Sequence, residues 1–364
     1  MIDDLYEQHF NDMFNVKSIS KKEYSDDEID KILKRLIRCL PNGGKLYKYR
    51  LIEGNSFENI YKCLRDKYLW LSKPIDLNDD DDTNLNIDLV KDVEYLENYI
   101  NMHPEKFIDF LIENAIKDDL QKKNILKNKN EIIKYFELEK QELSDSEIIN
   151  LLIENGYKYY KANECLIKYK IFIETMKKEI EVFARENTEK LIRLSQEIRE
   201  KAYVYSMSDS YDNDQLWAYY SDNKGFCIEY DYNKADSMDY DKKRKLIHTF
   251  KVVYKDKESF SLIPTFKAAI NKDEEMLKKE NKRANMQILT KKKGWSNENE
   301  WRLLLENLND NKLFLDLVSA IIIDDRSIDT ENAQKLINLA KINNWNVMVR
   351  KRDIYNKHYY ESLE

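Results

Sequence analysis

Glycine is scarce in this chain and is never arranged in a phosphate-binding pattern. Only 6 glycines occur in 364 residues, and none of them form G-x-G-x-x-G or G-x-x-x-x-G-K-[ST]. Both motifs need glycine because the backbone must come close to a phosphate group. The sequence therefore argues against a Rossmann dinucleotide site and against a P-loop.

Cysteine and histidine are also few, with 4 of each. The cysteines show no C-x-x-C spacing, and the histidines form neither H-x-H nor H-E-x-x-H. Zinc knuckles, redox dithiols and histidine metal centres are built on such spacings. We therefore expect reduced, mostly buried thiols and no metal cofactor.

Long apolar runs are missing as well. No window approaches the length of a membrane-spanning helix, and the first residues lack the basic and apolar regions of a signal peptide. Lys and Arg total 61 against 68 Asp and Glu, so a net charge of -7 makes the chain as a whole no basic nucleic-acid binder. Hydrophobic residues at 42% are enough for a folded core. We expect a folded cytoplasmic protein that does not enter the membrane.

The composition changes along the chain and divides it into parts. The N-terminal residues have helical spacing behind a capping box of Ser25 and Glu28. Lys, Glu, Ile and Leu recur at helical spacing between 88 and 200, with a second capping box at Ser144 and Glu147. We predict an N-terminal helical segment at 1–45, an α/β core in two parts at 46–87 and 201–364, and an all-helical insertion at 88–200.

Short apolar and β-branched runs predict the strands of the core. They are expected at 46–50, 68–72, 203–208, 225–231, 246–254, 298–305, 320–324 and 346–350. Helical spacing predicts helices at 55–66, 214–221, 265–290 and 330–343. Because strands lie on both sides of the insertion, we expect them to share one sheet. The predicted fold is α+β, with a mixed, largely antiparallel sheet.

Two glutamates near the C-terminal end of the core form the most informative pattern. Side chains alternate between the faces of a strand, so Glu298, Glu300 and Arg302 are expected on one face. Two carboxylates on one face repel unless solvent or a cation neutralises them. One interpretation is an exposed strand with a Glu–Arg ladder. The other is a carboxylate pair in a cleft, where one group stabilises positive charge and the other activates a nucleophile.

Two further strands carry candidate polar residues. Arg50 ends the strand 46–50, and an arginine there can hold a phosphate or carboxylate through two parallel hydrogen bonds. Ser206 and Ser208 share one face of the strand 203–208, where a hydroxyl can orient a carboxylate. Each has a structural alternative: a surface arginine paired with an acid, and two serines on a polar strand face.

Taken in chain order, these segments give Arg, then Ser-x-Ser, then Glu-x-Glu. That order is similar to the signature of ADP-ribosyltransferases, which cleave the nicotinamide bond of NAD. The resemblance implies an ADP-ribosyltransferase-like core with NAD as substrate and a protein or nucleic acid as acceptor, in a bacterial toxin or phage-defence setting. It assigns catalysis to Glu300, acceptor activation to Glu298 and bracing to Ser206. NAD contacts are then expected from Arg50, Tyr49, Ser208, Trp217, Tyr220 and Trp295, the last three having core packing as their alternative.

A broader resemblance runs through the chain. It consists of YKYR at 47–50, LSKP at 71–74, LND at 77–79, SMS at 206–208, LWAYY at 216–220, GFCIEY at 225–230, Trp295 and ENEWR at 298–302. Together these tracts resemble the bacterial family called domain of unknown function 2971. That resemblance implies a family but no activity.

A run of aspartates offers a competing chemistry. Asp79 to Asp82, combined with the two glutamates, are oxygen ligands suited to Mg²⁺ or Mn²⁺ in a metal-dependent nuclease or phosphodiesterase. The alternative for these residues is an acidic loop before a helix. A third interpretation of the whole chain is a non-catalytic interaction protein whose helical insertion binds a partner.

Two basic clusters bear on partners. They lie at 242–245 and 278–293, the second directly before the glutamates. Such clusters can steer RNA, DNA or NAD toward a cleft, and their alternative is a solvated lysine-rich surface.

Overall fold

The computed structural model describes most of the chain. The described residues are 2–13, 24–77, 88–114, 119–120, 122–123, 126–127, 129–130, 133, 143–256, 261–306, 308, 310–355 and 357–363. Two compact units result: Met1–Asn84 with Gln196–Lys257 and Asn285–Glu364, and Leu85–Ser195 with Glu258–Ala284. The first unit holds the sheet and the second is helical. The helical unit therefore contains Glu258–Ala284 as well as most of the predicted insertion at 88–200.

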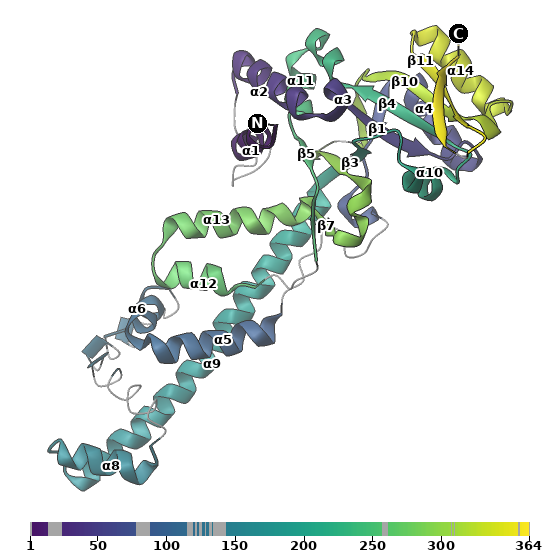
Figure 1. Cartoon of the computed structure of the whole chain (residues 1–364). Coiled ribbons are helices and arrows are strands. Elements are labelled where there is room, and N and C mark those ends of the chain that lie inside the picture. The colour runs from purple at the N-terminus through teal and green to yellow at the C-terminus, as the bar shows by residue number, and fades with distance from the viewer. Residues whose placement is uncertain are drawn as a thin grey trace. The chain divides into compact units, whose positions relative to one another are not determined.

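An eight-stranded sheet forms the centre of the first unit (Figure 1). Its strand order is β12-β11-β10-β4-β1-β3-β8-β5. The bounds are β1 Lys45–Arg50, β3 Ala202–Ser208, β4 Phe226–Asp231, β5 Thr249–Lys251, β8 Glu300–Glu306, β10 Val318–Asp324, β11 Asn346–Arg352 and β12 His358–Ser362. Only β10 and β11 pair in parallel in this sheet; the other neighbours are antiparallel. The α+β fold with a mixed, largely antiparallel sheet is confirmed.

Two short ladders lie outside this sheet. β2 Tyr68–Trp70 pairs with β9 Lys312–Phe314, and β6 Val253–Lys255 pairs in parallel with β7 Thr290–Lys292. The expectation of one shared sheet is therefore wrong for part of the predicted strands. The predicted strand at 246–254 is divided: Leu246 ends a helix, β5 pairs with β8, and β6 pairs with β7 instead.

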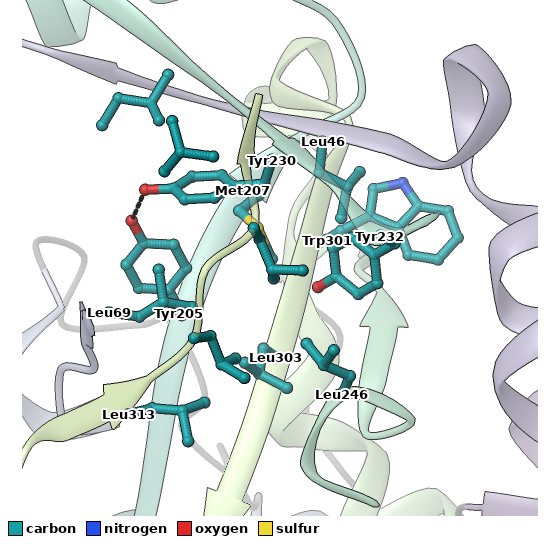
Figure 2. Close-up of a cluster of buried hydrophobic side chains, with 14 of the residues drawn as sticks. Leu46, Leu69, Tyr205, Met207, Tyr230, Tyr232, Leu246, Trp301, Leu303 and Leu313 are labelled. Carbon is teal, nitrogen blue, oxygen red and sulfur yellow. Dashed lines mark hydrogen bonds between the residues drawn. The ribbon is translucent and has the colours of Figure 1, made fainter. Parts of the chain in front are cut away.

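Helices cover both faces of the sheet. A large apolar core takes residues from α1 Ile2–Met13, α2 Asp26–Cys39, α4 Gly54–Arg65, α11 Tyr240–Leu246 and α14 Glu331–Asn343. Figure 2 shows part of this core, where Tyr205, Tyr230 and Trp301 gather with leucines from neighbouring strands. A smaller cluster on the other side joins Tyr47 and Tyr49 to α10 Asp214–Ser221. The short helices are α3 Pro41–Gly44, η1 Pro74–Asp76, η2 Tyr232–Ser237, η3 Met286–Leu289, η4 Lys293–Glu298 and η5 Asp325–Ser327.

The second unit is built from helices, as its composition predicts. They are α5 Leu89–Met102, α6 Pro104–Asn114, α8 Asp145–Glu154, α9 Tyr159–Lys201, α12 Ile263–Ile270 and α13 Glu274–Asn285. Both predicted capping boxes are present, at Ser25 and Ser144. The predicted helix at 265–290 is broken instead into α12, α13 and η3, with Lys272 at a φ of 55° in the first break. In the part of the chain that the structure describes, no helix has the length and apolar character needed to cross a membrane.

Candidate active site

The site lies where β1 and β3 stop pairing. The two strands are neighbours in the sheet, yet Tyr47 and Ser208 are their one registered pair. Further along β3, Val204 exchanges two main-chain hydrogen bonds with Ser72 instead, at 2.8 and 2.9 Å. Between these two points the strands bound a cavity of about 500 Å³, which we call the split cavity. Its volume is within the range of small-molecule sites.

Most of the residues predicted from the sequence line this cavity. Its walls include Tyr49, Arg50, Ser206, Ser208, Tyr220, Trp295, Glu298 and Glu300. They come from β1, β3, α10, η4 and β8, which are far apart in the sequence. The structure thus brings together an arginine, two serines and two glutamates that the motif order only placed in sequence.

The two glutamates meet through a lysine rather than through strand alternation. Glu298 ends η4 and Glu300 begins β8, so the prediction that both lie on one strand is wrong. Asn299 between them has a φ of 44°, a left-handed conformation that asparagine tolerates better than most residues. Lys291 Nζ donates to Glu298 Oε2 at 2.6 Å and to Glu300 Oε2 at 3.1 Å. The ammonium group therefore holds both carboxylates at one point of the cavity wall.

Arg302 holds the carboxylate of Glu300 in place. This arginine is fully buried, and its Nε and Nη2 donate to the Glu300 carboxylate at 2.8 and 3.3 Å. Its Nη1 donates to the Ile288 carbonyl at 2.8 Å, which locks the guanidinium plane. A side-chain hydrogen bond with Ser206 also lowers the pKa of Glu300. This is a charged, internally compensated group rather than an exposed Glu–Arg ladder.

The two carboxyl groups have pKa values shifted in opposite directions. Burial opposes the ionisation of Glu300, but the charges of Arg302 and Lys291 together hold the pKa of its carboxyl far below the usual range. Burial raises the pKa of Glu298, and Lys291 only partly offsets this effect. Opposite shifts in neighbouring carboxyls are the pattern by which enzymes separate a permanent anion from a proton acceptor.

Two hydrogen bonds orient Glu298. Tyr220 donates its hydroxyl to Glu298 Oε1 at 2.7 Å, and Ser208 donates to the Glu298 main-chain carbonyl at 2.9 Å. Tyr220 and Ser208 thus contact the glutamate rather than lying free for a ligand. Both act on its position.

Arg50 supplies a cation that the protein leaves open. Its Nε is buried and has no hydrogen-bond partner among the described residues. Lys48, two residues earlier on β1, also lines the cavity and donates to the Ser206 carbonyl across the gap between the strands. Burial, reinforced by the charge of Arg50, holds the pKa of Lys48 well below its usual range. An anionic ligand between these two side chains would give Arg50 Nε a hydrogen-bond acceptor and would raise the pKa of Lys48.

Two of the aromatic residues lie on the cavity wall, and a third packs in the core. Trp295 is 36% exposed and Tyr219 is 72% exposed; both line the cavity, with ring centroids 6.5 Å apart. Trp217 is fully buried and absent from the cavity wall. Its ring packs edge-on against Tyr49 at 5.3 Å and beneath the Arg350 guanidinium at 4.7 Å. The alternative of core packing therefore describes Trp217.

Comparison with known proteins gives one partial match. A family model described as "Protein of unknown function (DUF2971)" matches residues 216–303. Neither curated proteins nor solved structures gave a match. The matched stretch contains Tyr220, Lys291 and both glutamates, while Arg50 and Ser206 lie outside it.

Several residues of the cavity are missing from the sequence-based site. Lys291 is the most consequential, since the sequence places it in a lysine-rich tract that suggests a solvated surface. Tyr219, Trp70 and Asp76 also line the cavity. Tyr254 accepts a hydrogen bond from the Glu300 N–H at 2.8 Å. The place of Lys291 in the sequence could have suggested its role, because Lys291 precedes the glutamates by few residues and a buried carboxylate pair requires a cation.

Several lysines of the two basic clusters form ion pairs within the protein. Lys243 pairs with Asp30 at 2.9 Å and Lys242 with Asp239 at 2.8 Å. The cluster at 278–293 is divided between the two units, with Lys291 buried against the glutamates. The aspartates Asp79 to Asp82 lie outside the described residues. Within the described residues, no group of three or more His, Cys, Asp or Glu is arranged to hold a metal ion.

Proposed function

We propose that the split cavity binds NAD and that the chain transfers ADP-ribose from NAD to a macromolecular acceptor. The observation that carries the proposal is the convergence of Arg50, Ser206 and Glu300 on one cavity wall. These residues match the order of the ADP-ribosyltransferase signature, and their meeting point has the charges that the reaction needs. We place the activity in the bacterial cytoplasm, in a toxin or phage-defence setting, and infer an ADP-ribosyltransferase-like core.

Glu300 has the properties of the group that promotes nicotinamide loss. The bond between nicotinamide nitrogen and ribose C1′ breaks with its electron pair on nicotinamide, which leaves an oxocarbenium-like cation. An adjacent carboxylate stabilises that cation if it stays ionised in a site that excludes water. Arg302 and Lys291 keep Glu300 ionised although it is buried.

Glu298 has the properties of the group that activates the acceptor. The acceptor nucleophile forms a new bond to C1′ and loses its proton, so a base must take up that proton. The pKa of Glu298 is raised by burial, which makes it a better proton acceptor than an ordinary surface glutamate. Tyr220 holds one of its oxygens at 2.7 Å.

The remaining cavity residues suit the rest of NAD. The pyrophosphate carries negative charge, and Arg50 provides a cation on β1 with Lys48 Nζ beside it as a further hydrogen-bond donor. Trp295 and Tyr219 offer partly exposed rings for the nicotinamide or adenine.

Transfer of label from adenine-labelled NAD tests the proposal. Purified wild-type chain is incubated with labelled NAD and with protein and nucleic-acid fractions of a bacterial lysate. We expect label in one fraction, loss of at least about 99% of it with Glu300→Gln, and no change with Glu331→Gln, an exposed glutamate on α14. Circular dichroism of both variants checks their fold. Absence of both label and NAD consumption with folded wild-type chain would refute the proposal and favour an interaction protein.

A further inference from the structure

A second cavity adjoins the split cavity within the first unit. It measures about 450 Å³ and lies among α4, β2, β4 and the segment after β9; we call it the α4 cavity. Arg50, Trp70, Ser72 and Tyr205 line both cavities. Among the residues of the α4 cavity, the proposed transfer reaction gives a role to Arg50 alone.

The lining of this cavity combines aromatic rings with cationic side chains. Tyr205 and Tyr230 meet with their hydroxyls 2.6 Å apart, as Figure 2 shows. Further aromatic rings on the wall are Tyr68, Trp70 and Trp345. Cations come from Arg50, Lys62, Lys67 and Lys312, whereas Asp316 is the acidic residue on the wall. A ligand with a planar ring and a negative charge matches this lining.

Two buried polar atoms of the wall lack partners among the described residues. One is Arg50 Nε, a donor, and the other is Asp316 Oδ1, an acceptor. The second carboxylate oxygen of Asp316 is already engaged, since it accepts from Lys67 Nζ at 2.7 Å. Buried polar atoms are almost always satisfied, so an orphaned donor and an orphaned acceptor in one cavity indicate a ligand that supplies both complements.

We propose that the α4 cavity binds a purine nucleoside 5′-phosphate whose phosphate accepts from Arg50 and whose exocyclic amino group donates to Asp316. The ring then lies among the tyrosine and tryptophan side chains. The site is separate from the glutamates, so it does not depend on ADP-ribosyl transfer. Such a nucleotide has two possible sources: a free mononucleotide, or one half of a dinucleotide that reaches past Arg50 into the split cavity.

Cys63 provides a direct reporter of occupancy. It lines the α4 cavity but not the split cavity, and its thiol is partly buried. Alkylation of Cys63 in the wild-type chain is followed by mass spectrometry with and without AMP, at mildly alkaline pH because burial raises the pKa of this thiol. At an AMP concentration about tenfold above its Kd, alkylation should slow roughly tenfold. Cys165 on α9, in the helical unit, is the internal control and should react at an unchanged rate.

The chemistry of the ring edge gives the second test. AMP carries an amino group where IMP carries a carbonyl, so Asp316 should favour AMP by about tenfold. Asp316→Asn should remove this preference, while Asp310→Asn, an exposed neighbour outside the cavity, should keep it. If AMP fails to protect Cys63 in the folded chain, or if Asp316→Asn keeps the full preference for AMP, the assignment is wrong.

Competition distinguishes the two sources. NAD that protects Cys63 and displaces AMP identifies the ligand as half of a dinucleotide. Protection by AMP that persists under saturating NAD identifies a separate mononucleotide. Either outcome supports the site, and a lack of protection by AMP overturns it. Label transfer from NAD is measured in the same samples, so failure of the proposed reaction remains distinguishable from failure of this site.

Discussion

Lys48 Nζ on β1 donates a hydrogen bond to the Ser206 carbonyl on β3, in the gap where these neighbouring strands are not paired. The same nitrogen lies 4.2 Å from the centre of the Tyr205 ring. A side chain thus takes the place of a main-chain donor in the ladder. Because Lys48 satisfies the Ser206 carbonyl, the two strands can lie apart at this point, and the split cavity lies between them.

Lys48→Met should therefore destabilise the arrangement of β1 and β3 around the split cavity. The Ser206 carbonyl loses its donor, so we expect a loss of about 1 kcal/mol in the free energy of unfolding and weaker binding of anionic ligands. Urea denaturation and NAD binding by calorimetry measure the two effects. Lys351→Met, which removes an exposed lysine on β11, is the control and should change neither. Full retention of both properties in Lys48→Met would contradict this interpretation of the gap.

The pH dependence of stability should show the opposite pKa shifts of the glutamates. Glu300 has a folded-state pKa below its ordinary value of 4.5, so its contribution is present above that pH and is lost as the pH falls further. Glu298 has a raised pKa; its contribution is present below its ordinary value of 4.5 and is lost as the pH rises through the folded value. Urea unfolding from about pH 3 to about pH 8 measures the profile.

Replacing each glutamate singly separates the acid side of the stability profile from its alkaline side. Glu298→Gln should remove the loss on the alkaline side, and Glu300→Gln should remove the loss on the acid side. Glu300→Gln also leaves Arg302 buried without its carboxylate, so we expect about 3 kcal/mol lower stability at neutral pH. Equal effects of both variants on the same side of the profile would be inconsistent with opposite shifts.

Gly225→Ala should displace Arg50 through the backbone. A Cβ at this position would lie 2.1 Å from the Arg50 carbonyl oxygen and 2.6 Å from Ser221 Cβ, both impossible without movement. We expect a loss of about 3 kcal/mol and weaker NAD binding. Gly294→Ala, close to the glutamates but with nothing within 4 Å of its Cβ, should be nearly neutral. Comparable stability of the two variants by thermal unfolding would rule out the close approach.

Truncation of Trp295 should mainly lower ligand affinity, whereas truncation of Trp217 should mainly lower stability. Trp295→Ala removes a partly exposed ring, so stability should change by less than about 1 kcal/mol while ligand affinity falls. Trp217→Ala empties a fully buried position and should cost about 4 kcal/mol. Denaturation and NAD titration of both variants test this contrast. A strong stability loss in Trp295→Ala would place that ring in the core.

Local pattern was sufficient for the main elements and insufficient for the details that build the site. The capping boxes at Ser25 and Ser144 and the strands holding Arg50 and Ser206 depend on neighbouring residues alone, and they were predictable. β9 and β12 were missed, since a three-residue strand and a largely exposed edge strand carry little periodicity.

The glutamates show where such reasoning stops. Strand alternation placed Glu298 and Glu300 together for the wrong reason, because Asn299 turns the chain between them. The cation that joins them, Lys291, comes from β7, a strand outside the main sheet. Burial of a lysine within a lysine-rich tract depends on tertiary contacts, and no local pattern expresses it.

The gap between β1 and β3 is bounded by residues that lie far apart in the sequence. Lys48 and Ser206 are separated by 158 residues, and Glu300 follows nearly a hundred residues later. Closing so long a loop is among the slower steps of folding, and it must precede assembly of the cavity. The β1 residues of the split cavity therefore emerge long before the residues of β3 and β8 that complete its wall.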